Sequence, residues 1–104
     1  MGGNTYNKLV RDKIPEYLDS KNIPYEKRIA NEEEYKEELI KKLKEELEEF
    51  LEDNSIEEFA DIMEVVNAIK KLPDFANVEE VRLKKLEEKG GFDKKIIVKG
   101  NKYK

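Results

Sequence analysis

The fold is decided by residues 45–64, which read EELEEFLEDNSIEEFADIME. Between Lys44 and Lys70 the chain has ten carboxylates and no basic residue. Two carboxylates about 4 Å apart repel by roughly 4 kcal/mol at an effective dielectric constant of about 20. A folded protein relieves such crowding by proton uptake, by solvation or by binding a cation. The spacing of the acids in this stretch favours a cation.

Apolar residues predict a helix on each side of the turn at Asp53-Asn54. Upstream, Asn31-Glu32-Glu33-Glu34 has the pattern of a capping box, and an apolar stripe with a helical period runs on to about Glu52. Its members are Tyr35, Leu39, Leu43, Leu47 and Phe50. Downstream, Ser55 caps a second helix, which Pro73 stops near Leu72. This helix has a wide apolar face made of Ile56, Phe59, Ile62, Met63, Val65, Val66 and Ile69.

Smaller elements are predicted on both sides of this hairpin. The first is a short helix that has Pro15 in its first turn and ends near Ser20–Asn22. The second is a helix from Val78 to Glu88, which Asn77 caps and Gly90-Gly91 terminates. The third is a short β element that pairs Tyr25–Ile29 with Ile96–Val98. We therefore expect one all-α domain over residues 1–104. Its antiparallel helix pair forms a four-helix bundle on oligomerisation, as a homodimer or homotetramer, and a minor short β element decorates it.

The composition excludes several classes of function. The 104 residues are 44% charged and 38% hydrophobic, and they include no cysteine and no histidine. Disulfides and thiolate chemistry are thereby ruled out, and a di-iron site with Glu-x-x-His motifs is disfavoured. A cytoplasmic location is expected. The sequence has no membrane span and no signal-peptide pattern. The net charge is −11 over residues 32–64 but +2 before and +5 after them, which is unlike a nucleic-acid-binding module.

Two pairs of acids are spaced for metal binding. Glu46 and Glu49 lie three residues apart on one predicted helix, and Glu58 and Asp61 lie three apart on the next. An antiparallel hairpin brings both pairs to the same end, where four carboxylates suit Mg²⁺ or Mn²⁺. Plainer interpretations remain open: Glu58 closes a capping box with Ser55, and the other acids are solvated surface charge.

The same residues resemble a known family. Glu45-Glu46-x-x-Glu49 followed by Glu58-x-x-Asp61 is similar to the paired motif of the MazG-like, all-α nucleoside triphosphate pyrophosphohydrolases. That superfamily also includes dimeric dUTPases and phosphoribosyl-ATP pyrophosphohydrolases. Residues 6–15, YNKLVRDKIP, and residues 85–92, KLEEKGGF, resemble a small subgroup of predicted house-cleaning enzymes within it.

The resemblance implies an activity and a set of site residues. The reaction is hydrolysis of a nucleoside triphosphate between its α- and β-phosphates, which gives NMP and pyrophosphate. Glu46, Glu49, Glu58 and Asp61 bind Mg²⁺ by the family pattern, with Mn²⁺ as a substitute. Glu45, and Glu64 as a second candidate, orient the attacking water. The phosphates meet basic residues of the two flanking motifs, namely Lys8, Arg11, Lys13, Lys85 and Lys89.

Other interpretations of the sequence stay open. The enzyme could act on phosphoribosyl-ATP, or the acidic hairpin could be a non-catalytic interaction module for a basic partner protein. Gly90-Gly91 is either a helix stop or a close approach for a phosphate, and Phe92 either stacks on a base or belongs to the core. Arg11 could simply pair with Asp12. The preferred base and sugar have no local signal.

Overall fold

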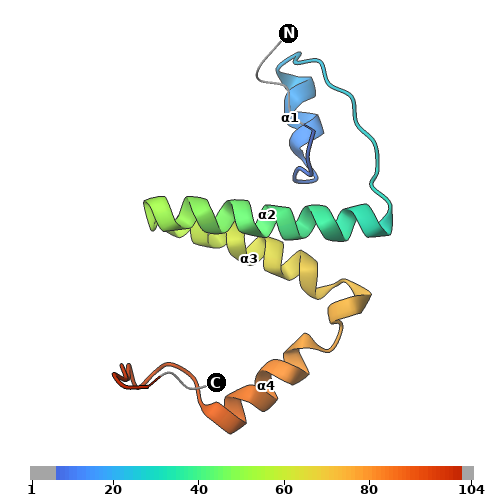
Figure 1. The fold of residues 1–104 in the computed structure, drawn as a ribbon. Coiled ribbons are helices and arrows are strands. Elements are labelled where there is room, and N and C mark those ends of the chain that lie inside the picture. The colour runs from blue at the N-terminus through green and yellow to red at the C-terminus, as the bar shows by residue number, and fades with distance from the viewer. Residues whose placement is uncertain (1–6, 102–104) are drawn as a thin grey trace.

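The computed structural model describes residues 7–101 and is helical. Figure 1 shows its elements in chain order. They are α1 (Ile14–Ser20), α2 (Glu32–Asp53), α3 (Ile56–Lys70), the short 3₁₀ helix η1 (Pro73–Phe75) and α4 (Val78–Lys89). The all-α prediction is confirmed. None of the helices in this part of the chain is long and apolar enough to cross a membrane.

The two long helices begin and end where local signals place them. The Asn31 side chain accepts a hydrogen bond from the Glu34 N–H at 2.8 Å, and Ser55 Oγ accepts one from the Glu58 N–H at 3.2 Å. Both caps were predicted. Asn54 ends α2 in the left-handed conformation, with φ of 52°, and its N–H donates to the Phe50 carbonyl. The turn therefore needs only Asn54 and Ser55, which forces α2 and α3 to run antiparallel.

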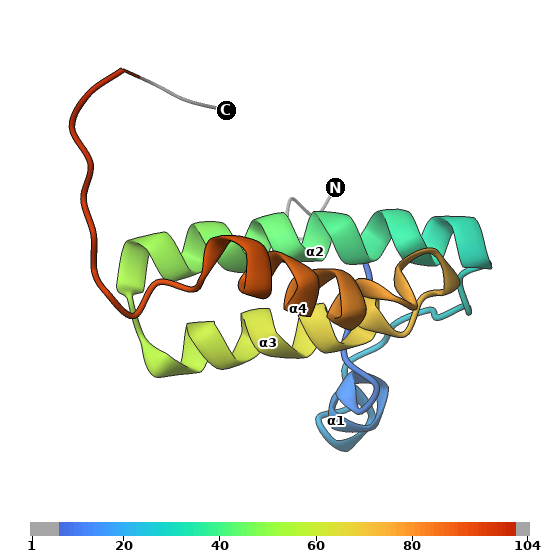
Figure 2. The same cartoon turned by 90° about the horizontal axis from the view of Figure 1, so that it is seen from below.

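The α2–α3 hairpin is the packing centre of the chain, and both views show the two helices side by side (Figures 1 and 2). Its buried cluster consists of Leu39, Val65 and Leu72, and Leu9 packs against this cluster from the segment before α1. Near the turn, the rings of Phe50 and Phe59 lie 5.6 Å apart. The core is small, and it leaves much of the predicted apolar surface uncovered.

Several residues predicted to lie on apolar faces are exposed in the single chain. Leu47 is 43% exposed on α2, and Ile56 and Met63 are 78% and 59% exposed on α3. No residue of α4 is buried, and this helix projects away from the hairpin (Figure 1). The radius of gyration is 18.5 Å, whereas a compact chain of this length would have about 13 Å. Part of the wide apolar face of α3, including Ile56 and Met63, thus has no cover within the described residues.

The predicted β element is not formed within residues 7–101. Residues 23–31 link α1 to α2, and residues 96–99 follow α4 on the opposite side of the hairpin (Figure 1), so the two segments cannot pair. Ile29 and Ile97 are 92% and 93% exposed. The predicted end of α4 is observed, because Gly90 has φ of 80°, whereas Asn77 precedes α4 without a side-chain capping hydrogen bond.

Candidate metal centre

Three of the four predicted metal ligands come together between α2 and α3. Glu46 of α2 and Glu58 and Asp61 of α3 each offer one carboxylate oxygen, and these oxygens all lie within 4.8 Å of one another. The i, i+3 spacing puts the two α3 acids on one face, and the antiparallel hairpin places Glu46 opposite them. Carboxylate oxygens at this separation suit a hard divalent cation that keeps several water ligands, such as Mg²⁺.

Glu46 is the most unusual member of this triad. It is only 7% exposed, and its Oε1 has no hydrogen-bond partner within the described part of the chain. The nearest cation, Lys42 Nζ, lies 3.9 Å from the other oxygen, Oε2. Burial raises the pKa of Glu46, and the charges of Glu49 and Asp61 raise it further. A buried carboxylate oxygen without a hydrogen-bond partner is costly, so this site favours either a proton or a cation.

Glu58 has a similar environment. Its Oε1 is also buried and has no hydrogen-bond partner among residues 7–101. Its pKa is raised, first by burial and then by the charge of Glu49 and a contact with that carboxyl group. Only half of the capping box with Ser55 forms: the Glu58 N–H donates to Ser55 Oγ, but the Glu58 side chain forms no bond back to the Ser55 N–H. The capping-box interpretation therefore does not account for this carboxylate.

Glu49, the fourth predicted ligand, lies beside the triad. It is exposed and does not belong to the group of converging oxygens, yet its charge raises the pKa of both Glu46 and Glu58. The site therefore has three converging carboxylates and a fourth at its rim.

The segment before α1 brings two cations to these acids. Arg11 Nη2 donates to Asp61 Oδ1 at 2.8 Å, and Lys8 Nζ donates to Glu45 Oε2 at 2.9 Å. The Lys8 hydrogen bond is the main cause of a lowered pKa for Glu45, and Lys42 Nζ at 3.3 Å adds to it. The acidic stretch thus has no basic residue within it, but basic residues from the segment before α1 contact it in the folded chain. The alternative pairing of Arg11 with Asp12 is not observed.

Lys42 is the site residue that sequence reasoning missed. It contacts Glu45 and Glu46 from three and four residues upstream, a spacing that marks helical neighbours. A hollow of about 170 Å³ beside it is lined by Asn7, Lys8, Leu9, Glu38, Lys41, Lys42 and Glu45.

The remaining predicted site residues lie elsewhere. Lys13 is exposed at the start of α1, and Glu64 is exposed on α3 outside the triad. Lys85 and Lys89 are exposed on α4, which projects away from the α2–α3 hairpin (Figure 1). None of these lysines forms an ion pair with another described residue. Tyr6, part of the opening motif, lies outside the described residues.

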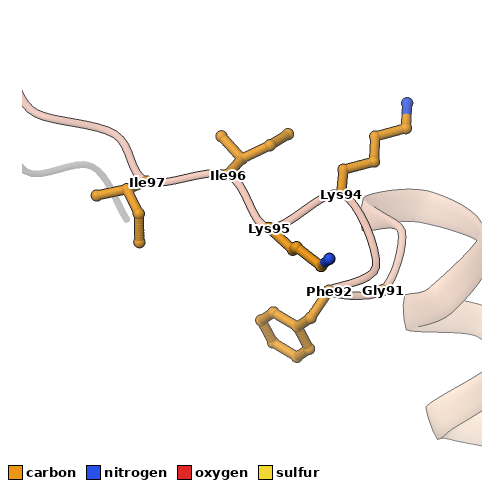
Figure 3. A pocket seen from close by; sticks show the side chains of 6 residues that line it. All are labelled: Gly91, Phe92, Lys94, Lys95, Ile96 and Ile97. Carbon is orange, nitrogen blue, oxygen red and sulfur yellow. The ribbon is translucent and has the colours of Figure 1, made fainter.

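A larger hollow, of about 350 Å³, follows α4, and no residue of the carboxylate triad lines it. Gly91, Phe92, Lys94, Lys95, Ile96 and Ile97 line it, and Figure 3 shows their side chains pointing to different sides of the backbone. Phe92 is 97% exposed, so it is not part of the core of this chain. Because its walls are open to solvent, this hollow is a weaker candidate for a ligand site than the triad.

Comparisons with models of protein families, with curated proteins and with solved structures return no match to this chain. The similarity to the MazG-like enzymes therefore stays a prediction from residues 45–61 and the two flanking motifs.

Proposed function

We propose that this protein is a Mg²⁺-dependent nucleoside triphosphate pyrophosphohydrolase, which converts NTP to NMP and pyrophosphate. The observation that carries the proposal is the buried, unpartnered oxygen of Glu46 within a group of three converging carboxylates. Glu46, Glu58 and Asp61 would hold the cation, with Glu49 at the rim. Bound there, Mg²⁺ would neutralise phosphate charge and lower the pKa of a water molecule. Mn²⁺ fits the same oxygen ligands.

The chain's own residues supply the rest of the proposed chemistry. In the reaction, water adds across the α–β phosphoanhydride bond, so NMP and pyrophosphate leave and one proton is released. By the family pattern, Glu45 is the candidate to orient the attacking water and receive that proton. The hydrogen bonds from Lys8 and Lys42 lower its pKa and make it a weaker base, so it must exchange these lysines for the water molecule before it can act. Arg11 and Lys8 reach the carboxylates from the segment before α1 and would meet the phosphates. Lys85 and Lys89 are assigned no role at the carboxylate site of their own chain.

The proposal includes a homo-oligomer built as a four-helix bundle. Ile56, Phe59, Met63 and Val66 are exposed along α3 at spacings of three, four and three residues, the a/d pattern of bundled helices. Ile40, Leu47 and Leu51 are exposed along α2. A second hairpin would cover both rows. Light scattering should report a dimer or tetramer for the wild type and a smaller species for Met63→Glu. A monomeric wild type would overturn this assembly.

Product analysis tests the proposed reaction. The protein is incubated with Mg²⁺ and a panel of standard and modified NTPs, and the products are followed by phosphorus NMR. We expect NMP and pyrophosphate, no reaction in EDTA, and loss of turnover in Glu46→Gln and Asp61→Asn with helicity unchanged. Glu48→Gln, on the exposed side of α2, is the matched control and should keep its activity.

Other products would refute the proposal in distinct ways. NDP and phosphate would mean that the wrong phosphoanhydride bond was assigned. Turnover unchanged in both variants would exclude the carboxylate triad. If no NTP of the panel is hydrolysed, either phosphoribosyl-ATP is the substrate, which a direct assay decides, or the acidic hairpin is a non-catalytic interaction module.

A further inference from the structure

The segment before α1 is fixed across the carboxylate site at three points. Leu9 packs against the buried cluster of the hairpin. On one side of it, Lys8 pairs with Glu45 of α2, and on the other side Arg11 pairs with Asp61 of α3. Figure 1 shows this segment reaching the hairpin from α1. Because Leu9 anchors the backbone by apolar burial, the Arg11 side chain can change partner without release of the segment.

The Arg11 pair has fewer hydrogen bonds than the pairs of the other two arginines in the chain. Arg28 donates to both oxygens of Glu34 at 2.6 Å, and Arg82 also contacts both oxygens of Glu79. Arg11 donates a single bond, from Nη2 to one oxygen of Asp61, although the exposure of the three arginines is similar, at 57% for Arg11, 62% for Arg28 and 59% for Arg82. A guanidinium has five N–H donors, so most donors of Arg11 have no partner within residues 7–101. Exposed single-contact pairs contribute little to stability and break readily.

The partner of Arg11 is one of the three converging carboxylates. Asp61 contributes an oxygen within 4.8 Å of those of Glu46 and Glu58, at the place where a divalent cation would bind. A dication there and the guanidinium carry the same sign of charge and share one carboxylate, so each weakens the binding of the other. A polyphosphate that arrives with the metal offers Arg11 a new, more negative partner, and planar bidentate contacts to phosphate suit a guanidinium.

We propose that Arg11 is an exchangeable cation of this site. Without metal it pairs with Asp61 and partly neutralises the triad, and when a divalent cation enters, Arg11 leaves Asp61 and binds the phosphate chain of the nucleotide. This inference rests on the proposed function, since it needs the triad to be the metal site. It assigns Arg11 two successive partners. It therefore predicts that removal of the Arg11 side chain strengthens metal binding and weakens phosphate binding.

Nitrogen–proton NMR of the arginine side chains observes the exchange in the wild-type protein. The chain has three arginines, so the Nε–H region holds three signals, which Arg→Lys variants assign. Titration with Mg²⁺ alone should shift or broaden the Arg11 signal and leave those of Arg28 and Arg82 unchanged. Addition of inorganic pyrophosphate should then move the Arg11 signal to a third position. An Arg11 signal that stays in place at saturating Mg²⁺ would overturn the exchange.

The Arg11→Gln variant tests whether the affinities for metal and for phosphate change in opposite directions. Mn²⁺ binding, measured by the EPR signal of the free ion, should become about fivefold tighter, because a competing surface pair is removed. Inorganic pyrophosphate binding at saturating Mg²⁺, measured by calorimetry, should become about tenfold weaker or more, because a charged hydrogen bond is lost. Arg11→Lys should recover part of the pyrophosphate affinity. Arg28→Gln, which removes a remote ion pair, is the control and should change neither affinity.

The outcomes separate this inference from the proposed function. A wild type that binds Mn²⁺ with an affinity lost in Glu46→Gln supports the metal site. If Arg11→Gln then binds Mn²⁺ equally or more weakly, the exchange is overturned while the metal site stands. A merely structural Arg11 would weaken both affinities together. If the wild type binds no Mn²⁺, the proposed function fails, and the exchange fails with it.

Discussion

Glutamine at position 46 should make the metal-free protein more stable, although it removes a proposed metal ligand. In the wild type, the Glu46 carboxylate is 7% exposed, and one of its oxygens has no hydrogen-bond partner within the described residues. Carboxylate oxygens of Glu58 and Asp61 lie within 4.8 Å of one of its oxygens, and Lys42 Nζ lies 3.9 Å from Oε2. Glutamine keeps the shape of the side chain, removes the charge and adds an N–H₂ donor that can face those oxygens.

The size of the effect follows from the distance. At 4.8 Å, two unit charges repel by about 0.9 kcal/mol at the dielectric constant of water and by about 3.5 kcal/mol at an effective value of 20. Proton uptake by Glu46 relieves part of this repulsion, since its pKa is raised. We therefore expect Glu46→Gln to gain about 1–3 kcal/mol at pH 8 without metal. For a domain of this size, about 1 kcal/mol corresponds to roughly 4–8 °C in Tm.

Thermal unfolding followed by circular dichroism measures this gain, with EDTA and with Mg²⁺. Protein concentration is held fixed, because association changes the apparent Tm. Wild type should gain stability from Mg²⁺, by about 2.7 kcal/mol at a hundred times the dissociation constant, whereas Glu46→Gln should gain none. Glu48→Gln, exposed on the same helix, should behave like the wild type in both conditions. A Glu46→Gln protein that melts below wild type in EDTA, or that Mg²⁺ still stabilises fully, would refute the argument.

Three further results are expected. The raised pKa values of Glu46 and Glu58 mean that their folded forms hold protons more readily than the unfolded chain does. Their stabilising contribution is therefore full below the ordinary value of 4.5 and is lost as pH rises through the raised pKa values, so in EDTA the difference in Tm between Glu46→Gln and wild type should widen from pH 4.5 upward. Leu39→Ala, at a position 4% exposed in the core, should lose about 2–5 kcal/mol in urea unfolding, and a loss below 1 kcal/mol would contradict the described core. Asn31→Ala should lose about 1 kcal/mol in the same assay, because the Glu34 N–H loses its acceptor, and no loss would contradict the cap.

Local signals were sufficient to predict the helices. Asn31 and Ser55 act on N–H groups three residues away, and the turn at Asn54 depends on one residue in the left-handed conformation. Such contacts involve neighbours in sequence, so the hairpin and its antiparallel direction follow from the chain alone. The pairing of Tyr25–Ile29 with Ile96–Val98 depended on where α4 leads the chain, and this cannot be deduced from local pattern.

The sequence predicted the three converging carboxylates of the candidate site, but it predicted neither their environments nor the contact of Lys42 with Glu46. Glu46 and Glu49 form one predicted pair of glutamates, and the sequence does not distinguish them. In the structure Glu46 is buried and Glu49 is exposed, because packing of α2 on α3 decides which acid faces inward. The contact of Arg11 with Asp61 spans 50 residues, and Lys8 reaches Glu45 across 37. No periodic pattern signals contacts over such separations. Through these contacts, the acidic stretch has basic neighbours in the folded chain although its own sequence has none.

The most direct test of the account is the position of a bound cation. A crystal of the wild-type protein grown with Mn²⁺ should give an anomalous difference peak between α2 and α3, with carboxylate oxygens of Glu46, Glu58 and Asp61 at roughly 2.0–2.3 Å. The Asp61→Asn protein, crystallised in the same way, should show a weaker peak or none. An Mn²⁺ peak elsewhere, or an empty triad at a concentration that supports turnover, would contradict the account.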